Sequence, residues 1–268
     1  YEWVWGEEVQ KNQLVYSHSY WVSKTTTDQG EEELRKMGKS TGNFLDPKTL
    51  DALIEDFGLD ALRYFLSTQG PLGTTDSEFS RDKYIEVYNS DLANKFGNAC
   101  KRVGDMISKY FGGEAKVLNR SIDDAVSQGI DQRPDSLAFV EVILPNFENL
   151  KLGSSGSVAI GFVSEVNEYI DKHRPFTLFK SEERHPDVAA CLYNCVESLR
   201  IASILLWPFI PDKCEAFWRR IGFDHYAEQL KDNGKGDLEA WVKWGQLEPG
   251  TPIEKGDPLF PRYQVEKK

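Results

Sequence analysis

Most of the chain spaces its apolar residues as helices do. The longest periodic run, residues 80–113, places apolar side chains four or seven positions apart and predicts one long helix that ends at Gly112 and Gly113. The apolar positions of this run are Ile85, Leu92, Phe96, Val103, Ile107 and Phe111. Further helices are predicted near residues 134–150, 158–174, 186–207, 211–221 and 236–244, with a loop at 151–157. The chain is therefore predicted to be mainly α, with a helical bundle as its body.

A smaller piece that contains a strand precedes this bundle. Residues 13–22 alternate in polarity and are rich in aromatic and β-branched types, which predicts a strand. The polar stretch 23–35 is predicted to be an exposed loop, and the glycine-rich and threonine-rich stretch 69–80 a connection. The bundle therefore follows a short strand and two polar segments.

Two short helices are predicted between these polar segments. Asp46 is a plausible N-cap, Pro47 suits the first helical position and Gly58 follows the predicted end. Residues 60–68 then form a second helix. Its apolar side is predicted to consist of Leu62, Phe65 and Leu66.

Composition narrows the class of protein. The chain has 268 residues, of which 40% are hydrophobic, so it can bury a core and is not a disordered chain. Its net charge of −11 provides no overall field for nucleic acid, so an RNA partner would bind a local patch. No apolar run approaches the ~18 to 20 residues that span a bilayer, so no membrane partner is expected.

The four cysteines favour packing over metal binding. They include no CxxC pair, and Cys191 and Cys195 are spaced i, i+4 among apolar residues on one predicted helix. We therefore expect buried thiols, a reducing compartment and no metal site in this chain.

The segment Lys36-Met37-Gly38-Lys39-Ser40 is a candidate phosphate-binding loop. A flexible arm with two ammonium groups can neutralise charge that develops on phosphate oxygens as a phosphoryl bond breaks. Taken alone, this pentapeptide is more often a solvated surface loop.

Asn98 and Arg102 are a candidate pair for reading bases. Their i, i+4 spacing puts an amide and a planar guanidinium on one helix face, where both can bond the edges of unstacked bases. Taken alone, this spacing is more often that of a packing amide beside a surface cation.

Longer segments resemble a known family. KMGKSTGNFLDP, then FGLDALRYFL, then EFSRDKYIEVYNSDLANKFGNACKRV resemble class I aminoacyl-tRNA synthetases, and among them the methionyl-tRNA synthetases. The segments NEYI, LLWPFIPDKCEAFWRRIG and DPLFPRY follow in the family's order, so the resemblance covers about residues 13–265. The family's loop signature is KMSKS, from which this chain departs at Gly38.

The resemblance implies a reaction and its partners. The family activates methionine with ATP to methionyl adenylate, transfers the acyl group to tRNA(Met), and reads the CAU anticodon with a helical bundle. By carry-over, Lys36 and Lys39 hold the pyrophosphate moiety, Ser40 adds a lesser contact, and the ATP-binding loop includes Met37 and Gly38. ATP with Mg²⁺ is expected for the whole enzyme. The implied location is the cytoplasm, with an organelle as the alternative.

The resemblance also assigns anticodon residues. Asn98 and Arg102 match the family's amide and arginine, and Phe176 falls where the family has a tryptophan on which a base stacks. The alternative for Phe176 is a core residue after Pro175. The neighbouring His173 and Arg174 could contact phosphate, although an ordinary role at a helix end is more common.

The resemblance further suggests how the chain is divided. Residues 1–80 are expected to be the end of a class I catalytic domain with the KMSKS loop and stem-contact helices. Residues 81–222 are expected to form the anticodon-binding bundle, and 223–268 an extension that packs back on the core. Between His18 and Lys36 the spacing is about nine residues longer than in the family's hairpin, an acidic insertion predicted to be a solvated face.

The family's HIGH signature and methionine pocket have no match in the chain. We therefore expect the C-terminal part of a methionine–tRNA ligase, inactive alone, which meets ATP and methionine through the N-terminal half. Two alternatives are a tRNA-binding module without catalysis, which an open reading frame starting near residue 1 would favour, and a helical interaction protein with no tRNA affinity.

Overall fold

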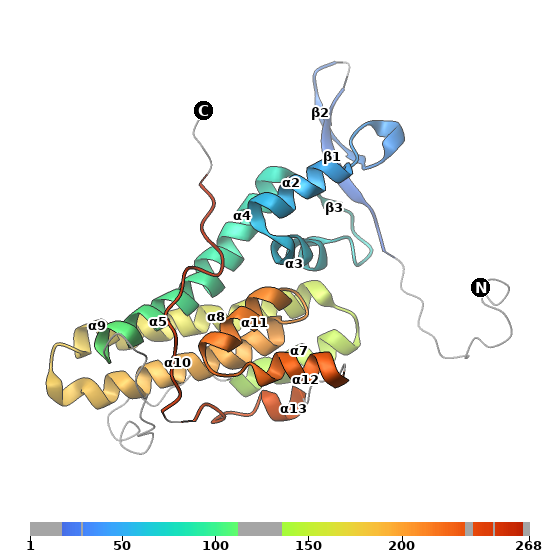
Figure 1. Ribbon diagram of the computed structural model, residues 1–268. Helices are drawn as coiled ribbons and strands as arrows, with labels where there is room; N and C mark the ends of the chain where they lie inside the picture. Colours follow the sequence, from blue (N-terminus) through green and yellow to red (C-terminus); the bar gives the residue numbers. More distant parts are fainter. Residues whose placement is uncertain (1–17, 28, 112–135, 234–237, 249, 265–268) are drawn as a thin grey trace, which may run out of the picture. The chain divides into compact units, whose positions relative to one another are not determined.

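The computed structural model describes residues 18–27, 29–111, 136–233, 238–248 and 250–264 (Figure 1). Its residues divide into two compact units. One comprises Tyr1–Phe44 with Gly70–Phe79, and the other Leu45–Gln69 with Ser80–Lys268.

The first unit is a small sheet. Strand β1, Trp21–Thr26, lies between β2, Glu32–Lys36, which is antiparallel to it, and the short parallel β3, Ser77–Glu78. The 3₁₀ turn η1, Lys39–Thr41, follows β2. The strand predicted at 13–22 therefore lies further along the chain, because β1 starts only at Trp21. Residues 13–17 lie outside the described part.

The expected loop at 23–35 is wrong, because this stretch forms most of a β-hairpin. Threonines favour strands even where both faces are wet, and cross-strand pairs replace a buried face as the source of stability. The Lys24 ammonium pairs with the Glu32 carboxylate at 3.0 Å. The turn closes where the Thr27 amide donates to the Glu31 carbonyl at 2.8 Å and Gly30 adopts φ +82°. The segment is exposed, as predicted, but ordered by main-chain pairing.

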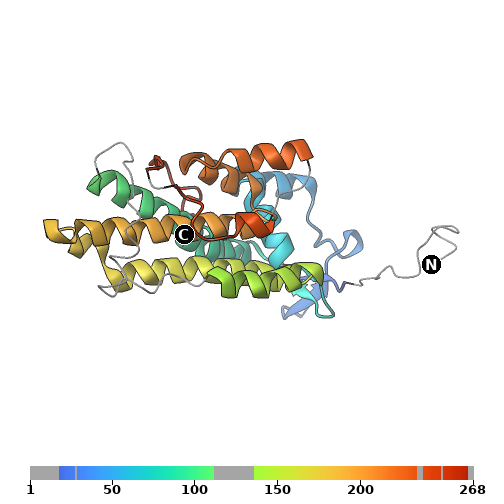
Figure 2. The same ribbon diagram turned by 90° about the horizontal axis from the view of Figure 1, so that it is seen from below.

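The second unit is helical. Its elements are α2 (Pro47–Phe57), α3 (Leu59–Gln69), α4 (Arg81–Val87), the π-helix η2 (Tyr88–Gly97), α5 (Asn98–Tyr110), α7 (Ser136–Glu148), α8 (Leu152–His173), α9 (Pro175–Leu178), the 3₁₀ turn η3 (Glu182–Arg184), α10 (His185–Leu206), α11 (Pro211–Arg220), α12 (His225–Asn233) and α13 (Leu238–Trp241). Helices α8 and α10 lie side by side, with α5 and α7 against them (Figure 1, Figure 2).

Helix α2 confirms its predicted ends. The Asp46 side chain accepts a hydrogen bond from the Thr49 amide at 2.7 Å, and Pro47 occupies the first helical position. Gly58 ends the helix with φ +85°. In α3, however, Leu66 is 39% exposed, so the apolar side predicted for that helix is narrower than expected.

The long helix predicted over 80–113 is continuous from Arg81 to Tyr110, but its middle third is a π-helix rather than an α-helix. Gly112 and Gly113 lie outside the described residues. The π segment is tightly packed: a Cβ on Gly97 would lie 3.2 Å from the Phe260 carbonyl oxygen. An apolar spacing of four and seven does not separate these two helical forms, since both bury one stripe.

The expected loop at 151–157 is also wrong, because residues 152–157 are the start of α8 and Lys151 is its N-cap. Its glycines permit a close approach to α3: a Cβ on Gly156 would lie 2.4 Å from Cγ2 of Thr68. Tertiary packing therefore overrides the low helix propensity of glycine and serine. Helix α12 was missed by the sequence analysis.

Helix α10 is the core of the bundle. By length and composition it is long and apolar enough to cross a membrane, so the expectation that no apolar run has this length is wrong. The whole of its apolar window is nevertheless buried inside the unit. Cys191 and Cys195 lie on it, fully buried and unpaired, as predicted. Burial raises the pKa of the Cys195 thiol, so it remains protonated.

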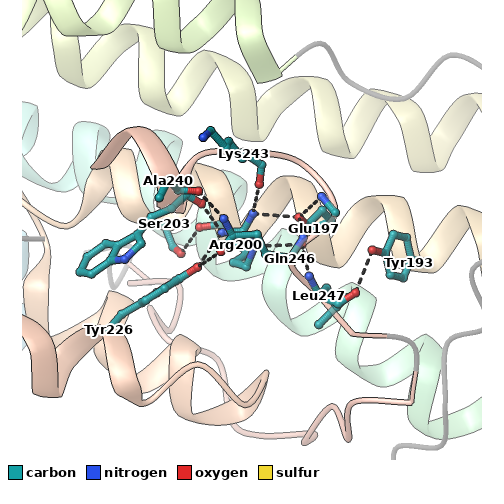
Figure 3. Close-up of polar contacts among 11 residues, drawn as sticks. Tyr193, Glu197, Arg200, Ser203, Tyr226, Ala240, Lys243, Gln246 and Leu247 are labelled. Carbon is teal, nitrogen blue, oxygen red and sulfur yellow. Dashed lines mark hydrogen bonds and ion pairs between the residues drawn. The ribbon is translucent and has the colours of Figure 1, made fainter. Parts of the chain in front are cut away.

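A buried ion pair on α10 fastens the segment that follows α12 (Figure 3). Glu197 and Arg200 are both fully buried and paired at 2.8 Å. Glu197 accepts hydrogen bonds from the amides of residues 245–247, and Arg200 donates to the carbonyl oxygens of Trp241 and Lys243 and to the Tyr226 hydroxyl. Every polar group of the pair has a partner, which makes this cluster a structural fastening rather than an open site.

Candidate functional site

The candidate phosphate loop lies in the first unit and begins at Lys36, the last residue of β2. The Met37 amide donates to the Trp21 carbonyl at 2.8 Å, which fixes the start of the loop on the sheet. Its five residues, Lys36 to Ser40, are half-buried or exposed. The loop is therefore accessible to a ligand and held at its base.

Asn43 organises this loop, and the sequence analysis did not identify it. Its side-chain oxygen accepts from the Gly38 amide at 3.0 Å and from the Thr41 hydroxyl at 2.5 Å. Its amide nitrogen donates to Ser23 Oγ at 3.0 Å and to the Lys36 carbonyl at 3.3 Å. The signal was present in the GN pair that follows the pentapeptide, because an asparagine can satisfy backbone groups on both sides of a tight turn.

The two lysines rest against aromatic rings. The Lys36 ammonium lies 3.4 Å from the Tyr20 ring centroid, and the Lys39 ammonium lies 5.6 Å from that of Phe44. Neither ammonium forms an ion pair with a residue that the structure describes. An incoming anion would therefore meet two cations without having to displace a carboxylate.

Gly38 does not require glycine. Its φ of −171° is extended backbone, and a Cβ there would meet the hydroxyl oxygens of Thr41 at 3.4 Å and Ser40 at 4.0 Å, both ordinary contacts. Compared with KMSKS, Gly38 removes a hydroxyl group, although the backbone conformation at this position does not require glycine.

The second constellation lies in the helical unit, where α5 faces α8. Asn98 Nδ2 donates to Asn167 Oδ1 at 3.5 Å, and Arg102 Nη2 donates to Asp171 Oδ1 at 2.5 Å. Both contacts join residues 69 positions apart, so α5 and α8 run parallel to each other here. Asn98 and Arg102 thus share one face, as the spacing predicts, and Asn167 and Asp171 are partners that the sequence analysis did not identify.

Phe176 lies at the end of the same helical unit, on α9. Phe176 is 40% exposed, which contradicts the alternative of a core residue. Helix α9 is held beside the end of α5, because the Phe179 ring stacks on the Tyr110 ring with centroids 4.3 Å apart. The structure therefore brings α9, the helix that contains Phe176, to the end of the bundle at which α5 terminates (Figure 1).

The histidines are placed as ordinary residues. Burial lowers the pKa of His173, and Lys172 lowers it further, so its ring is neutral at neutral pH. His18 is exposed, and its Nδ1 lies 2.8 Å from the Ser19 carbonyl oxygen. Among the residues in the described ranges, no group of three metal-ligating side chains is arranged to hold an ion.

Comparisons with known proteins identify what the chain as a whole resembles. Residues 3–104 match the family model described as tRNA synthetases class I (M). The methionine–tRNA ligase of Halalkalibacterium halodurans is 34% identical over 239 residues, which are 87% of this chain and 33% of that protein. The enzyme of Bacillus subtilis is 35% identical over 237 residues, again 87% of this chain and 33% of the relative.

Solved structures give the same result. The chain matches apo methionyl-tRNA synthetase of Mycobacterium tuberculosis with a TM-score of 0.63 and 26% identity, over 82% of this chain and 41% of that one. The complex of that synthetase with methionyl-adenylate gives a TM-score of 0.65 and 26% identity, over 84% and 41%.

These similarities define a class, the class I tRNA synthetases, to which the chain is related. Within that class the similarity is to the methionyl-tRNA synthetases, and the chain spans about a third of the length of the curated relatives it matches. The family match begins at residue 3, so the resemblance extends further toward the N-terminus than the range 13–265 inferred from the motifs.

Proposed function

We propose that this chain serves methionine–tRNA ligase in two ways: it supplies the KMSKS-type loop that binds ATP phosphates, and it reads the CAU anticodon of tRNA(Met). The ligase as a whole would condense methionine with ATP and transfer the acyl group to the tRNA. Buried free thiols suit a reducing compartment, so the proposed location is the cytoplasm.

The observation that carries the proposal is the face shared by Asn98 and Arg102. An exposed amide beside a guanidinium offers donors and an acceptor to the Watson–Crick edge of an unpaired base. The Asp171 carboxylate fixes the direction of the guanidinium before RNA arrives, which reduces the entropy lost on binding. Phe176 adds an exposed ring on which a base can stack.

In the loop, Lys36 and Lys39 would hold the β- and γ-phosphates of ATP, which is expected to arrive with Mg²⁺. Charge accumulates on the pyrophosphate oxygens as their bond to the α-phosphorus breaks, and an ammonium that meets this charge lowers the barrier. Lys39 is the stronger candidate, with contacts from Ser40 and from the main chain at Met37 and Gly38. Asn43 would keep the loop in the shape that presents both lysines.

We assign the proposed roles to three successive parts of the chain. Residues 1–80 would end the catalytic domain and contact the tRNA stem, 81–222 would form the anticodon-binding bundle, and 223–268 would brace it. The bracing is supported by contacts of the last segment with the bundle. The Tyr88 hydroxyl donates to the Pro261 carbonyl at 2.7 Å, and Asn89 exchanges two hydrogen bonds with the main chain of Tyr263.

A binding experiment tests the anticodon proposal. Arg102→Ala should weaken binding of a hairpin RNA with a CAU loop by about 1 to 3 kcal/mol, and it should reduce the preference for CAU over a changed loop. Arg219→Ala is the matched control, because it removes the same charge from an exposed position on α11. Equal losses for the two variants would show that only overall charge matters and would contradict base reading.

A further inference from the structure

The corner between α8 and α9 contains an arginine in an unfavourable backbone conformation. Arg174 has φ 47° and ψ 56°, the left-handed region, where a residue with a Cβ is strained. Its amide ends α8 by donating to the Ile170 carbonyl at 2.9 Å, and its carbonyl begins α9 by accepting from the Thr177 amide at 2.8 Å. The chain reverses through this one residue, a position that glycine fills with less strain.

The fold itself gives no reason for an arginine here. The Arg174 side chain is exposed and forms no ion pair or hydrogen bond with the residues that the structure describes. Its guanidinium carbon lies 5.8 Å from the centroid of the exposed Phe176 ring. A strained residue whose side chain contributes so little to the folded state indicates a use outside the folding of the chain.

The surroundings indicate what that use is. Arg174 is the C-cap of α8, three positions after Asp171, so the corner directly follows the last turn of α8, on which Asp171 pairs with Arg102. The guanidinium plane and the Phe176 ring are neighbouring π surfaces at this corner. Unpaired bases stack on aromatic rings and on guanidinium planes alike.

We propose that Arg174 and Phe176 form one composite shelf on which an unpaired nucleobase of the anticodon loop stacks, and that Arg174 is retained in spite of its backbone strain for this purpose. The inference rests on the proposed function, since it specifies how the same surface holds RNA. It assigns Arg174 to base stacking rather than to a phosphate contact.

Stability and binding should respond to Arg174→Gly in opposite directions. The glycine relieves the left-handed strain, so Tm should rise by about 2 to 4 °C. The loss of the guanidinium should weaken binding of a CAU hairpin RNA by about fivefold. A residue with a purely structural role would not lose binding while it gains stability.

Leu150→Gly is the matched control. Leu150 is the other residue with a side chain that has a positive φ in the described chain, at 54°, and it lies after α7. Its replacement should raise Tm by a similar amount and leave RNA binding unchanged. Arg174→Ala keeps the strain, so it should weaken binding without the gain in Tm.

Base stacking and phosphate contact are separated by two further measurements. An abasic nucleotide at one loop position should make binding insensitive both to Arg174→Gly and to Phe176→Ala, because both variants would lose the same base. Arg174→Lys keeps the charge but not the plane, so it should bind as weakly as Arg174→Ala. Full rescue by lysine, or unchanged binding by Arg174→Gly, would overturn the inference. If wild-type protein does not prefer CAU at all, the proposed function fails first and the shelf fails with it.

Discussion

The buried Glu197–Arg200 pair provides the sharpest prediction about stability. The Glu197 carboxylate is fully buried, and its two oxygens accept five hydrogen bonds: two from Arg200 and one each from the amides of Gly245, Gln246 and Leu247. Glu197→Gln keeps the shape but replaces one accepting oxygen with an NH₂ group, which is a donor. Whichever way the amide is turned, at least two donors lose their acceptor and the guanidinium loses its counter-charge (Figure 3).

The expected cost can be worked from these contacts. Each buried donor left without an acceptor costs about 1 to 3 kcal/mol, and removal of one partner from a buried ion pair costs about 3 to 5 kcal/mol. These two energies partly count the same lost interactions and are not added. We therefore expect Glu197→Gln to lower the free energy of unfolding by about 3 to 5 kcal/mol. The damage should be concentrated in residues 241–247, which the pair fastens to α10.

Urea unfolding followed by far-UV circular dichroism measures the loss, and amide hydrogen exchange at residues 245–247 locates it. Glu248→Gln is the control, because it makes the same change of charge at an exposed position of the same segment. It should alter stability by less than about 0.5 kcal/mol. A loss under about 1 kcal/mol for Glu197→Gln would refute the reasoning, since apolar packing alone would then hold the segment.

Three further outcomes are expected. Gly38→Ser should change stability by less than about 0.5 kcal/mol in thermal unfolding and leave pyrophosphate binding intact, because the added Cβ makes only ordinary contacts, with the Thr41 and Ser40 hydroxyls. Asn43→Ala should speed amide exchange at Gly38 and weaken pyrophosphate binding measured by calorimetry; unchanged exchange would show that the loop holds its own shape. Tyr88→Phe should cost about 1 kcal/mol, seen by urea unfolding, through its lost bond to the Pro261 carbonyl. Burial raises the pKa of the Tyr88 hydroxyl from 10.0 to about 12, so wild type should lose stability as pH rises through that window, and the variant should lose less.

Elements with strong local signals could be predicted from the sequence. The cap of α2 needs only Asp46, Pro47 and Gly58, whose preferences act within one turn of helix, and all three have the predicted roles. The placement of Cys191 and Cys195 follows from their apolar neighbours. Such predictions depend on short-range chemistry, which can be read directly from the sequence.

Elements that depend on distant partners could not be predicted in this way. The hairpin β1–β2 is stabilised by cross-strand pairs such as Lys24 with Glu32, which no alternation of polarity reveals. The start of α8 is helical because Gly156 lets it approach Thr68 on α3, a contact across the fold. Gly97, at the end of the π-helix η2, lies close to the main chain of Phe260, which is far away in the sequence.

In the candidate sites too, some features could be predicted from the sequence and others could not. The face of Asn98 and Arg102 follows from spacing alone, whereas their partners Asn167 and Asp171 lie 69 residues away and emerge only in the fold. Asn43 lies close in sequence, but its hydrogen bonds on both sides of the loop become evident only from the geometry. The strain at Arg174 is a property of its backbone conformation, which the residue type does not predict.

The most direct test of the central claim is equilibrium binding of the chain to a tRNA(Met) transcript and to the same transcript with its CAU anticodon changed, at two salt concentrations. If the α5–α8 face reads bases, the CAU transcript binds more tightly by about 1 to 3 kcal/mol for each altered contact. The salt dependence should be similar for both transcripts, because phosphate contacts are shared. Equal affinity for the two transcripts at both salt concentrations would contradict the account.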